Sequence, residues 1–204
     1  MKECQSQLLR ASSHRRMPWK NGLGVTTEIL IEPSNATLGN FDWRLSMARI
    51  DAAGPFSSFP NIDRLLVVLE GCVHLEIEGR PAIALTPDDA PVRFPGELAV
   101  SAMLVTAAGV PPRPAIDLNL MVRRGRYEAD LRRVAVERVD EYLPSAEVTA
   151  FLCRTAGLRI AHGRDSHSLQ CDDVLLVRGH WPRPLQLSHA SSAVLYAVEI
   201  DRVS

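Results

Sequence analysis

Arg64 is the residue whose type and position in the chain point most directly to chemistry. It opens the apolar run RLLVVL at residues 64–69, which predicts a β-strand that ends in a turn at Gly71. Alternate residues of a strand share one face, so Arg64 shares its face with Leu66 and Val68. If the strand belongs to a closed barrel, that face is the lumen, and the sequence predicts a guanidinium inside it.

A guanidinium that is removed from water needs a partner, because an unpaired buried charge is strongly unfavourable. One partner within the chain could be a carboxylate such as Glu28 or Asp42. The other partner could be the carboxylate of a bound ligand, which the planar fork of N–H donors on Arg64 fits. The spacing of the residues leaves both alternatives open.

The sequence around Arg64, FSSFPNIDRLLVVLEGCVHLEIEG at residues 56–79, has the rhythm of the first motif of a cupin barrel. In its metal-binding form, two His separated by one residue are followed by a Glu and, after six further residues, by the Gly of a turn. If Gly71 is that Gly, Arg64 stands where the Glu ligand would be, and residues 57–60 contain no His. A cation in place of a ligating carboxylate argues against a metal and for a pocket that attracts an anion.

The six His do not supply an alternative metal site, because no two of them are spaced as H-x-H, H-x-x-H or H-x-x-x-H. The second cupin motif would place its ligand three residues after a P-x-G turn. At Phe94-Pro95-Gly96 that position is Ala99, which cannot ligate. The sequence therefore predicts no metal and no other cofactor.

A second group of polar and aromatic residues lies in the segment MPWKNGLG at residues 17–24. Its glycines permit close backbone approach, so the segment could form a loop that caps a pocket. Trp19 would then supply apolar contact, and Lys20 or Asn21 polar specificity. The alternative is a loop that only plugs one end of a barrel.

Polar and apolar residues also alternate along DLNLMVRRG at residues 117–125, where Asp117, Asn119, Met121 and Arg123 would share a face. A polar face usually meets solvent. In a barrel it could line the lumen instead, and Asn119 could then orient a ligand.

Composition excludes several classes of function. With 23 basic and 24 acidic residues the formal net charge is −1, which gives no reason to expect nucleic acid or an anionic membrane as a partner. No apolar run approaches the roughly 20 residues that a membrane span needs, and the polar N-terminus has no signal-peptide core. We therefore expect a cytoplasmic protein. The chain also lacks a G-x-S-x-G elbow and a phosphate-binding glycine loop.

Fourteen Pro and twelve Gly separate short β-type runs, so the sequence predicts an all-β protein. Residues 64–69 and 73–77 are expected to form a hairpin around the Glu70-Gly71 turn. Residues 131–143 alternate weakly and favour a strand over a helix. The run VLLVRG at 174–179 echoes LVVLEG at 66–71, as a degenerate second barrel would. Other strands are expected at 25–31, 42–50, 82–85, 99–105, 117–122, 149–154, 158–162, 174–178 and 193–200.

The segments at 17–29, 41–71, 94–96 and 117–125, taken together and in this order, resemble the HutD/Ves family of metal-free cupin-like proteins. In this chain Leu23 replaces a glycine of the family's PWKNGGG signature. The resemblance implies a bicupin, two jelly-roll-like β-barrels in a single 1–204 unit. The N-terminal barrel with the pocket would span about residues 15–125, and a degenerate barrel about residues 126–204.

The resemblance also implies an association with bacterial histidine degradation. We expect a metal-independent, regulatory protein that senses or buffers a small carboxylate of that pathway, urocanate or N-formylglutamate. The alternative is a metal-independent isomerase, epimerase or hydrolase with Glu28 as base and Lys20 or His74 as proton partner. A third possibility is an interaction protein with a filled barrel. Two copies could form a homodimer through sheet edges. The residues expected to bind the ligand are Trp19, Lys20, Asn21, Glu28, Ser46, Phe59, Arg64 and Asn119.

Overall fold

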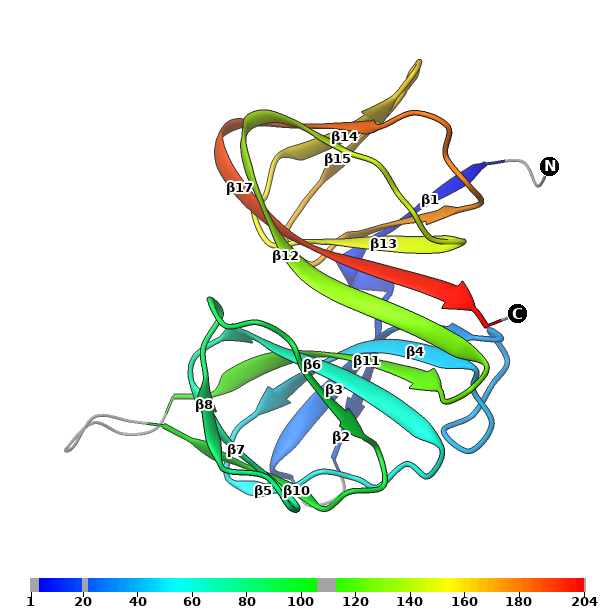
Figure 1. Ribbon diagram of the computed structural model, residues 1–204. Helices are drawn as coiled ribbons and strands as arrows, with labels where there is room; N and C mark the ends of the chain where they lie inside the picture. The colour runs from blue at the N-terminus through cyan, green and yellow to red at the C-terminus, as the bar shows by residue number, and fades with distance from the viewer. Residues whose placement is uncertain (1–3, 20–21, 106–112, 204) are drawn as a thin grey trace. The chain divides into compact units, whose positions relative to one another are not determined.

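A computed structural model describes residues 4–19, 22–105 and 113–203 of the chain, and these residues form an all-β protein (Figure 1). They contain seventeen strands and one short 3-10 helix, η1, at Ala11–Ser13. The strands are β1 Gln5–Leu9, β2 Arg15–Pro18, β3 Gly24–Glu32, β4 Trp43–Ile50, β5 Gly54–Pro55, β6 Ile62–Glu70, β7 Val73–Ile77, β8 Ile83–Leu85, β9 Val92–Pro95, β10 Val100–Leu104, β11 Ala115–Arg123, β12 Tyr127–Tyr142, β13 Val148–Cys153, β14 Leu158–His162, β15 Asp165–Leu169, β16 Val174–Arg178 and β17 Leu185–Arg202.

The predicted fold class is confirmed, and most strands lie where the apolar runs between Pro and Gly predicted them. Strands β7, β14 and β16 have the predicted bounds. The ambiguous segment after residue 130 is the strand β12, so its alternating pattern was the correct guide. Strands β1, β2, β5, β9 and β15 were not predicted; they are short, with two to five residues each, and carry little pattern.

The chain divides into two units, one of residues 15–126 and one of residues 1–14 together with 127–204. The first unit contains a six-stranded sheet in the order β2-β3-β4-β11-β6-β9 and a four-stranded sheet in the order β5-β10-β7-β8. All recorded strand pairs are antiparallel, as in a jelly roll. Lys20 and Asn21 lie outside the described residues.

The core of this first unit lies between its two sheets. Leu66 and Val68 of β6 belong to one buried cluster with Leu75 of β7 and Val100 of β10. Because β6 and β7 are in different sheets, this cluster joins the two sheets.

The expected hairpin between residues 64–69 and 73–77 is wrong. Strand β6 pairs with β11 and β9, whereas β7 pairs with β10 and β8 in the other sheet. The turn at Gly71, which has φ +82°, therefore carries the chain from one sheet to the other. A Cβ at Gly71 would lie 3.2 Å from Cα of Ala115, so a side chain here would be tight as well as strained by the positive φ.

The second unit has a sheet in the order β1-β16-β13-β17-β14-β15, with β12 paired to β17. Its first strand, β1, comes from the start of the chain and pairs with β16 along five residues. Gly179 follows β16 with φ +91°, as Gly71 follows β6, which matches the sequence echo between the two segments. The core of this unit includes Phe151, Leu158 and Leu187.

Candidate functional site

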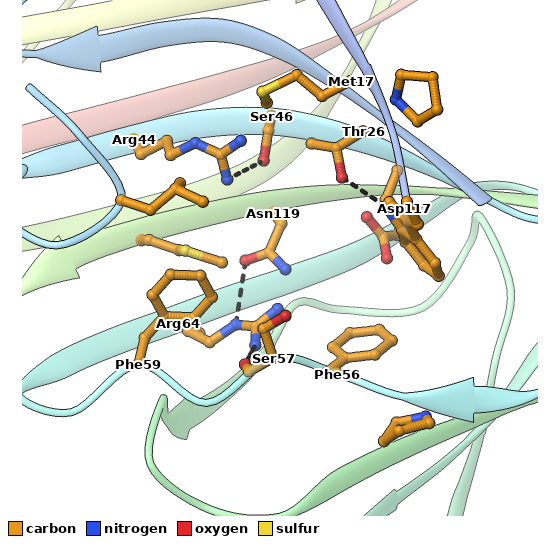
Figure 2. Close-up of a pocket in the computed structure, with 16 residues that line it drawn as sticks. Met17, Thr26, Arg44, Ser46, Phe56, Ser57, Phe59, Arg64, Asp117 and Asn119 are labelled. Atoms are coloured by element: carbon orange, nitrogen blue, oxygen red, sulfur yellow. Dashed lines mark hydrogen bonds between the residues drawn. The ribbon is translucent and has the colours of Figure 1, made fainter. Parts of the chain in front are cut away.

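A cavity of about 460 Å³ lies in the unit of residues 15–126 (Figure 2), within the usual range for small-molecule pockets. Strands β2, β3, β4, β6 and β11 and the segment after β5 supply its walls. The cavity is lined by Met17, Pro18, Trp19, Thr26, Leu38, Arg44, Ser46, Ala48, Pro55, Phe56, Ser57, Phe59, Arg64, Asp117, Asn119 and Met121.

Strand register arranges the polar residues of this cavity in levels. On the central strand β11, alternate residues Met121, Asn119 and Asp117 face the lumen, and each has a partner on β4 and another on β6. The three levels across β4, β11 and β6 are Arg44–Met121–Arg64, Ser46–Asn119–Leu66 and Ala48–Asp117–Val68. The lumen therefore changes from cationic through neutral polar to acidic along one ladder.

Arg64 is 3% exposed and occupies the cationic level. Its Nε donates to Oδ1 of Asn119 at 3.4 Å, and its Nη1 donates to the backbone oxygen of Ser57 at 3.3 Å. Its Cζ lies 5.1 Å from the ring centroids of both Phe56 and Phe94, which fix the plane of the guanidinium. Both hydrogen bonds are long, and Nη2 donates to none of the described residues.

Burial lowers the pKa of Arg64 to about 10, an effect that Asp117 opposes and Arg44 reinforces. The guanidinium therefore remains charged at neutral pH. No carboxylate among the described residues lies within ion-pair distance of it. Of the two carboxylates that the sequence offered as internal partners, Glu28 pairs with Arg44 and Asp42 pairs with Arg126.

The second guanidinium of the cavity, that of Arg44, is neutralised within the protein. Its Nε lies 2.7 Å from Oε2 of Glu28, and its Nη1 is 3.4 Å from the hydroxyl of Ser46. The other oxygen of Glu28 lies 3.0 Å from Nη2 of Arg15, which is mostly exposed. Glu28 thus has two cationic partners, and both of its carboxylate oxygens are engaged in ion pairs.

Replacement of Glu28 by glutamine should destabilise the fold by about 1–3 kcal/mol, because it leaves Arg44 buried without its counter-charge. Urea denaturation at neutral pH measures this loss. Arg15→Ala is the matched control, since it removes the exposed partner of the same carboxylate and should cost below about 1 kcal/mol. Equal losses for the two variants would contradict the assignment of Arg44–Glu28 as the structural pair.

Asp117 is the functional candidate that sequence reasoning did not nominate. It is 1% exposed, lines the cavity, and neither carboxylate oxygen has a hydrogen-bond partner of normal geometry among the described residues. Burial raises its pKa to about 7, although the charge of Arg64 and the nearby backbone N–H of Ala48 oppose this shift. A buried carboxyl that titrates near neutrality and lines a cavity is typical of functional sites.

Trp19, which follows β2, lines one wall of the cavity. The indole Nε1 donates to the hydroxyl of Thr26 at 2.8 Å, and the backbone N–H of Trp19 donates to the oxygen of Gly24. A Cβ at Gly24 would lie 2.3 Å from the oxygen of Arg49 and 3.0 Å from the indole ring. Glycine is therefore required here for the ring to reach its place.

The residues that the sequence nominated for ligand binding fall into three groups. Trp19, Ser46, Phe59, Arg64 and Asn119 line the one cavity. Glu28 lies behind Arg44 and does not line it. Lys20 and Asn21 are outside the described residues. The signal for Asp117 was present in the sequence, because Asp117 and Asn119 are two residues apart on one strand.

Within the described residues, no group of three or more His, Cys, Asp and Glu side chains is placed to hold a metal ion. His74, the suggested proton partner, lies on β7 of the four-stranded sheet and does not line the cavity. The same parts of the chain contain no helix that is long and apolar enough to cross a membrane.

Comparisons with known proteins point to one family. A family model described as HutD matches residues 11–195. An uncharacterized 21.2 kDa protein from the hutC 3' region of Pseudomonas putida is 43% identical over 129 residues, which cover 63% of this chain and 64% of that protein. Protein Ves of Citrobacter koseri is 37% identical over 122 residues, covering 58% and 60% of the two chains. The chain thus spans less than two thirds of these curated relatives.

Solved structures cover more of the chain. HutD from Pseudomonas fluorescens SBW25 has a TM-score of 0.80 and 28% identity, with 98% of this chain and all of that chain covered. A conserved protein of unknown function from Pseudomonas aeruginosa PAO1 has a TM-score of 0.86 and 29% identity over 97% and 99% of the chains. Bacillus subtilis oxalate decarboxylase, at a TM-score of 0.64 and 9% identity over 97% and 78%, shares the fold alone. The chain therefore belongs to the HutD/Ves family of cupin-like proteins.

Proposed function

We propose that the unit of residues 15–126 binds a small carboxylate on Arg64. The observation that carries this proposal is a guanidinium with 3% exposure, inside a 460 Å³ cavity, without an ion-pair partner among the described residues. Nη2 and the second N–H of Nη1 are available to a bidentate acceptor. Phe56 and Phe59 lie beside the buried guanidinium, and burial strengthens its attraction for an anion.

The role that we propose for this binding is to sense or buffer an intermediate of histidine degradation, without a metal. Support comes from membership of the HutD/Ves family and from the relative in the hutC 3' region of Pseudomonas putida. Urocanate and N-formylglutamate are the candidate ligands. The open cavity argues against an interaction protein whose barrel is filled by side chains.

A second candidate function is metal-independent proton transfer on a bound carboxylate, and Asp117 is the observation that favours it. Its pKa of about 7 suits a general acid or base at neutral pH, whereas Glu28 is held between two arginines. Chromatography of protein incubated with each acid distinguishes the two functions. Turnover that Asp117→Asn abolishes would favour the enzyme.

Isothermal titration of chelator-treated protein with urocanate and N-formylglutamate tests the first proposal. We expect saturable binding of at least one acid, with an affinity that does not change when divalent cations are restored. Binding that appears only after a metal is added would contradict metal independence. Absence of heat with both acids would remove these intermediates as ligands.

A further inference from the structure

The cavity has a second end, opposite Arg64, that the anchoring of a carboxylate does not explain. Asp117 lies two levels from Arg64 on the ladder, since the residue of β11 paired with Arg64 is Met121. The long side chain of Arg64 reaches back to Asn119, one level from Asp117. Alternate residues of a strand are about 7 Å apart, so Asp117 lies about this far along β11 from Asn119, the residue that the guanidinium contacts. A single small molecule can span this distance.

No side chain of the described residues forms an ion pair or a hydrogen bond of normal geometry with Asp117, which is influenced only by the charge of Arg64 and the nearby backbone N–H of Ala48. Both its oxygens are buried without a hydrogen-bond partner of normal geometry among the described residues. The neighbouring cation Arg44 is held by Glu28 at 2.7 Å, and Arg64 is turned towards Asn119 and Ser57. A buried polar group without a partner is costly, and such a group in a cavity marks a place where a ligand can supply the missing bond.

The walls between the two ends determine what kind of molecule fits. Trp19 and Pro55 line the cavity with apolar surface, and the Trp19 indole is fixed by its bond to Thr26. Figure 2 shows the side chains of Arg64 and Asp117 turned into the same space, with Asn119 between them. The site therefore has an anion-binding end and an acceptor end, with Asn119 at the level between them and apolar surface from Trp19 and Pro55 in its walls.

We propose that Asp117 accepts a hydrogen bond from an N–H group of the ligand, so that the pocket selects small acids that carry a nitrogen-bound hydrogen opposite their carboxylate. This inference rests on the proposed binding of a carboxylate by Arg64 and adds the class of acid. Acids of equal shape that lack the N–H leave Asp117 unpaired, and a site built for a hydrogen bond discriminates against them.

Two matched pairs of acids test the proposal by isothermal titration. Urocanate has a ring N–H that 3-(oxazol-5-yl)acrylate replaces with oxygen at nearly the same shape. N-formylglutamate has an amide N–H that its ester counterpart, 2-(formyloxy)glutarate, replaces with oxygen. For at least one pair we expect the wild-type protein to bind the N–H acid at least about tenfold more tightly. In Asp117→Ala the preference within that pair should fall below about twofold, while the acid without N–H keeps its affinity.

The outcomes separate the two proposals. Equal wild-type affinity within both pairs leaves carboxylate binding in place and overturns the role of Asp117. A preference that persists in folded Asp117→Ala also overturns it. Absence of binding of all four acids overturns both proposals. Thermal unfolding checks that Asp117→Ala is folded. If it is not, the wild-type affinities within each pair of acids still test whether the pocket selects the N–H group.

Discussion

Replacement of Arg64 by alanine should lower the affinity for the bound acid about 100-fold or more. Loss of one partner from a buried, charge-assisted pair costs about 2–5 kcal/mol of binding free energy. The variant should remain folded, because Arg64 has no ion pair within the described residues to lose, and its desolvation is itself unfavourable. Isothermal titration measures the affinity, and circular dichroism confirms the fold.

Two further variants define what Arg64 supplies. Arg64→Lys keeps the charge but loses the planar fork of donors, so we expect an intermediate loss of about tenfold. Arg16→Ala removes an exposed arginine from β2, next to the cavity-lining Met17, and should not change the affinity. Equal loss in Arg64→Lys and Arg64→Ala would show that geometry dominates over charge. Unchanged affinity in folded Arg64→Ala would falsify the anchor role.

Asp117→Asn should raise the free energy of unfolding at pH 8 by about 2–4 kcal/mol. The pKa of Asp117 rises from 3.8 to about 7 on folding, so the folded state holds a proton that the unfolded state releases. Its carboxyl therefore reduces stability progressively between pH 4 and 7, and the penalty is complete above pH 7. Asparagine has no proton to lose and avoids this penalty.

Urea denaturation of both proteins at several pH values checks this prediction. The gain in Asp117→Asn should be largest at pH 8 and should shrink towards zero as the pH falls to 4. Glu128→Gln changes an exposed carboxylate on β12 and should give a difference close to zero at every pH. A gain for Asp117→Asn that is independent of pH would contradict the raised pKa. A stabilised variant with weakened binding would show a group retained for function at the expense of stability.

The positions of most strands could be predicted from the sequence. Whether a given face of a strand meets solvent or the lumen could not. The alternation in residues 117–123 placed Asp117, Asn119 and Met121 together, but a polar face can meet solvent or a lumen. The cavity shows that it is the lumen, and on β4 the polar face with Arg44 and Ser46 points the same way. The alternation of residues identifies which side chains share a face of the strand. The closing of the sheets into a barrel determines whether that face meets solvent or the lumen.

Strand pairing was the less predictable property. The turn at Gly71 has the sequence of a hairpin, yet it connects two sheets, because positive φ at a glycine serves either connection. The levels of the cavity join residues from β4, β6 and β11 that are far apart in the chain. Arg64 could be found from one local motif, whereas the isolation of Asp117 depends on the partners of Arg44 and Glu28, which no local pattern contains.

The pairing of β1 with β16 bears on the order in which the two units can fold during synthesis. Strand β1, Gln5–Leu9, is made before the other described strands, but its partner β16 is made some 165 residues later. The unit of residues 15–126 is continuous in sequence and can fold as soon as it has emerged. The other unit is discontinuous and must wait for nearly the whole chain. The cavity of residues 15–126 can therefore form before the unit that contains β1 is complete.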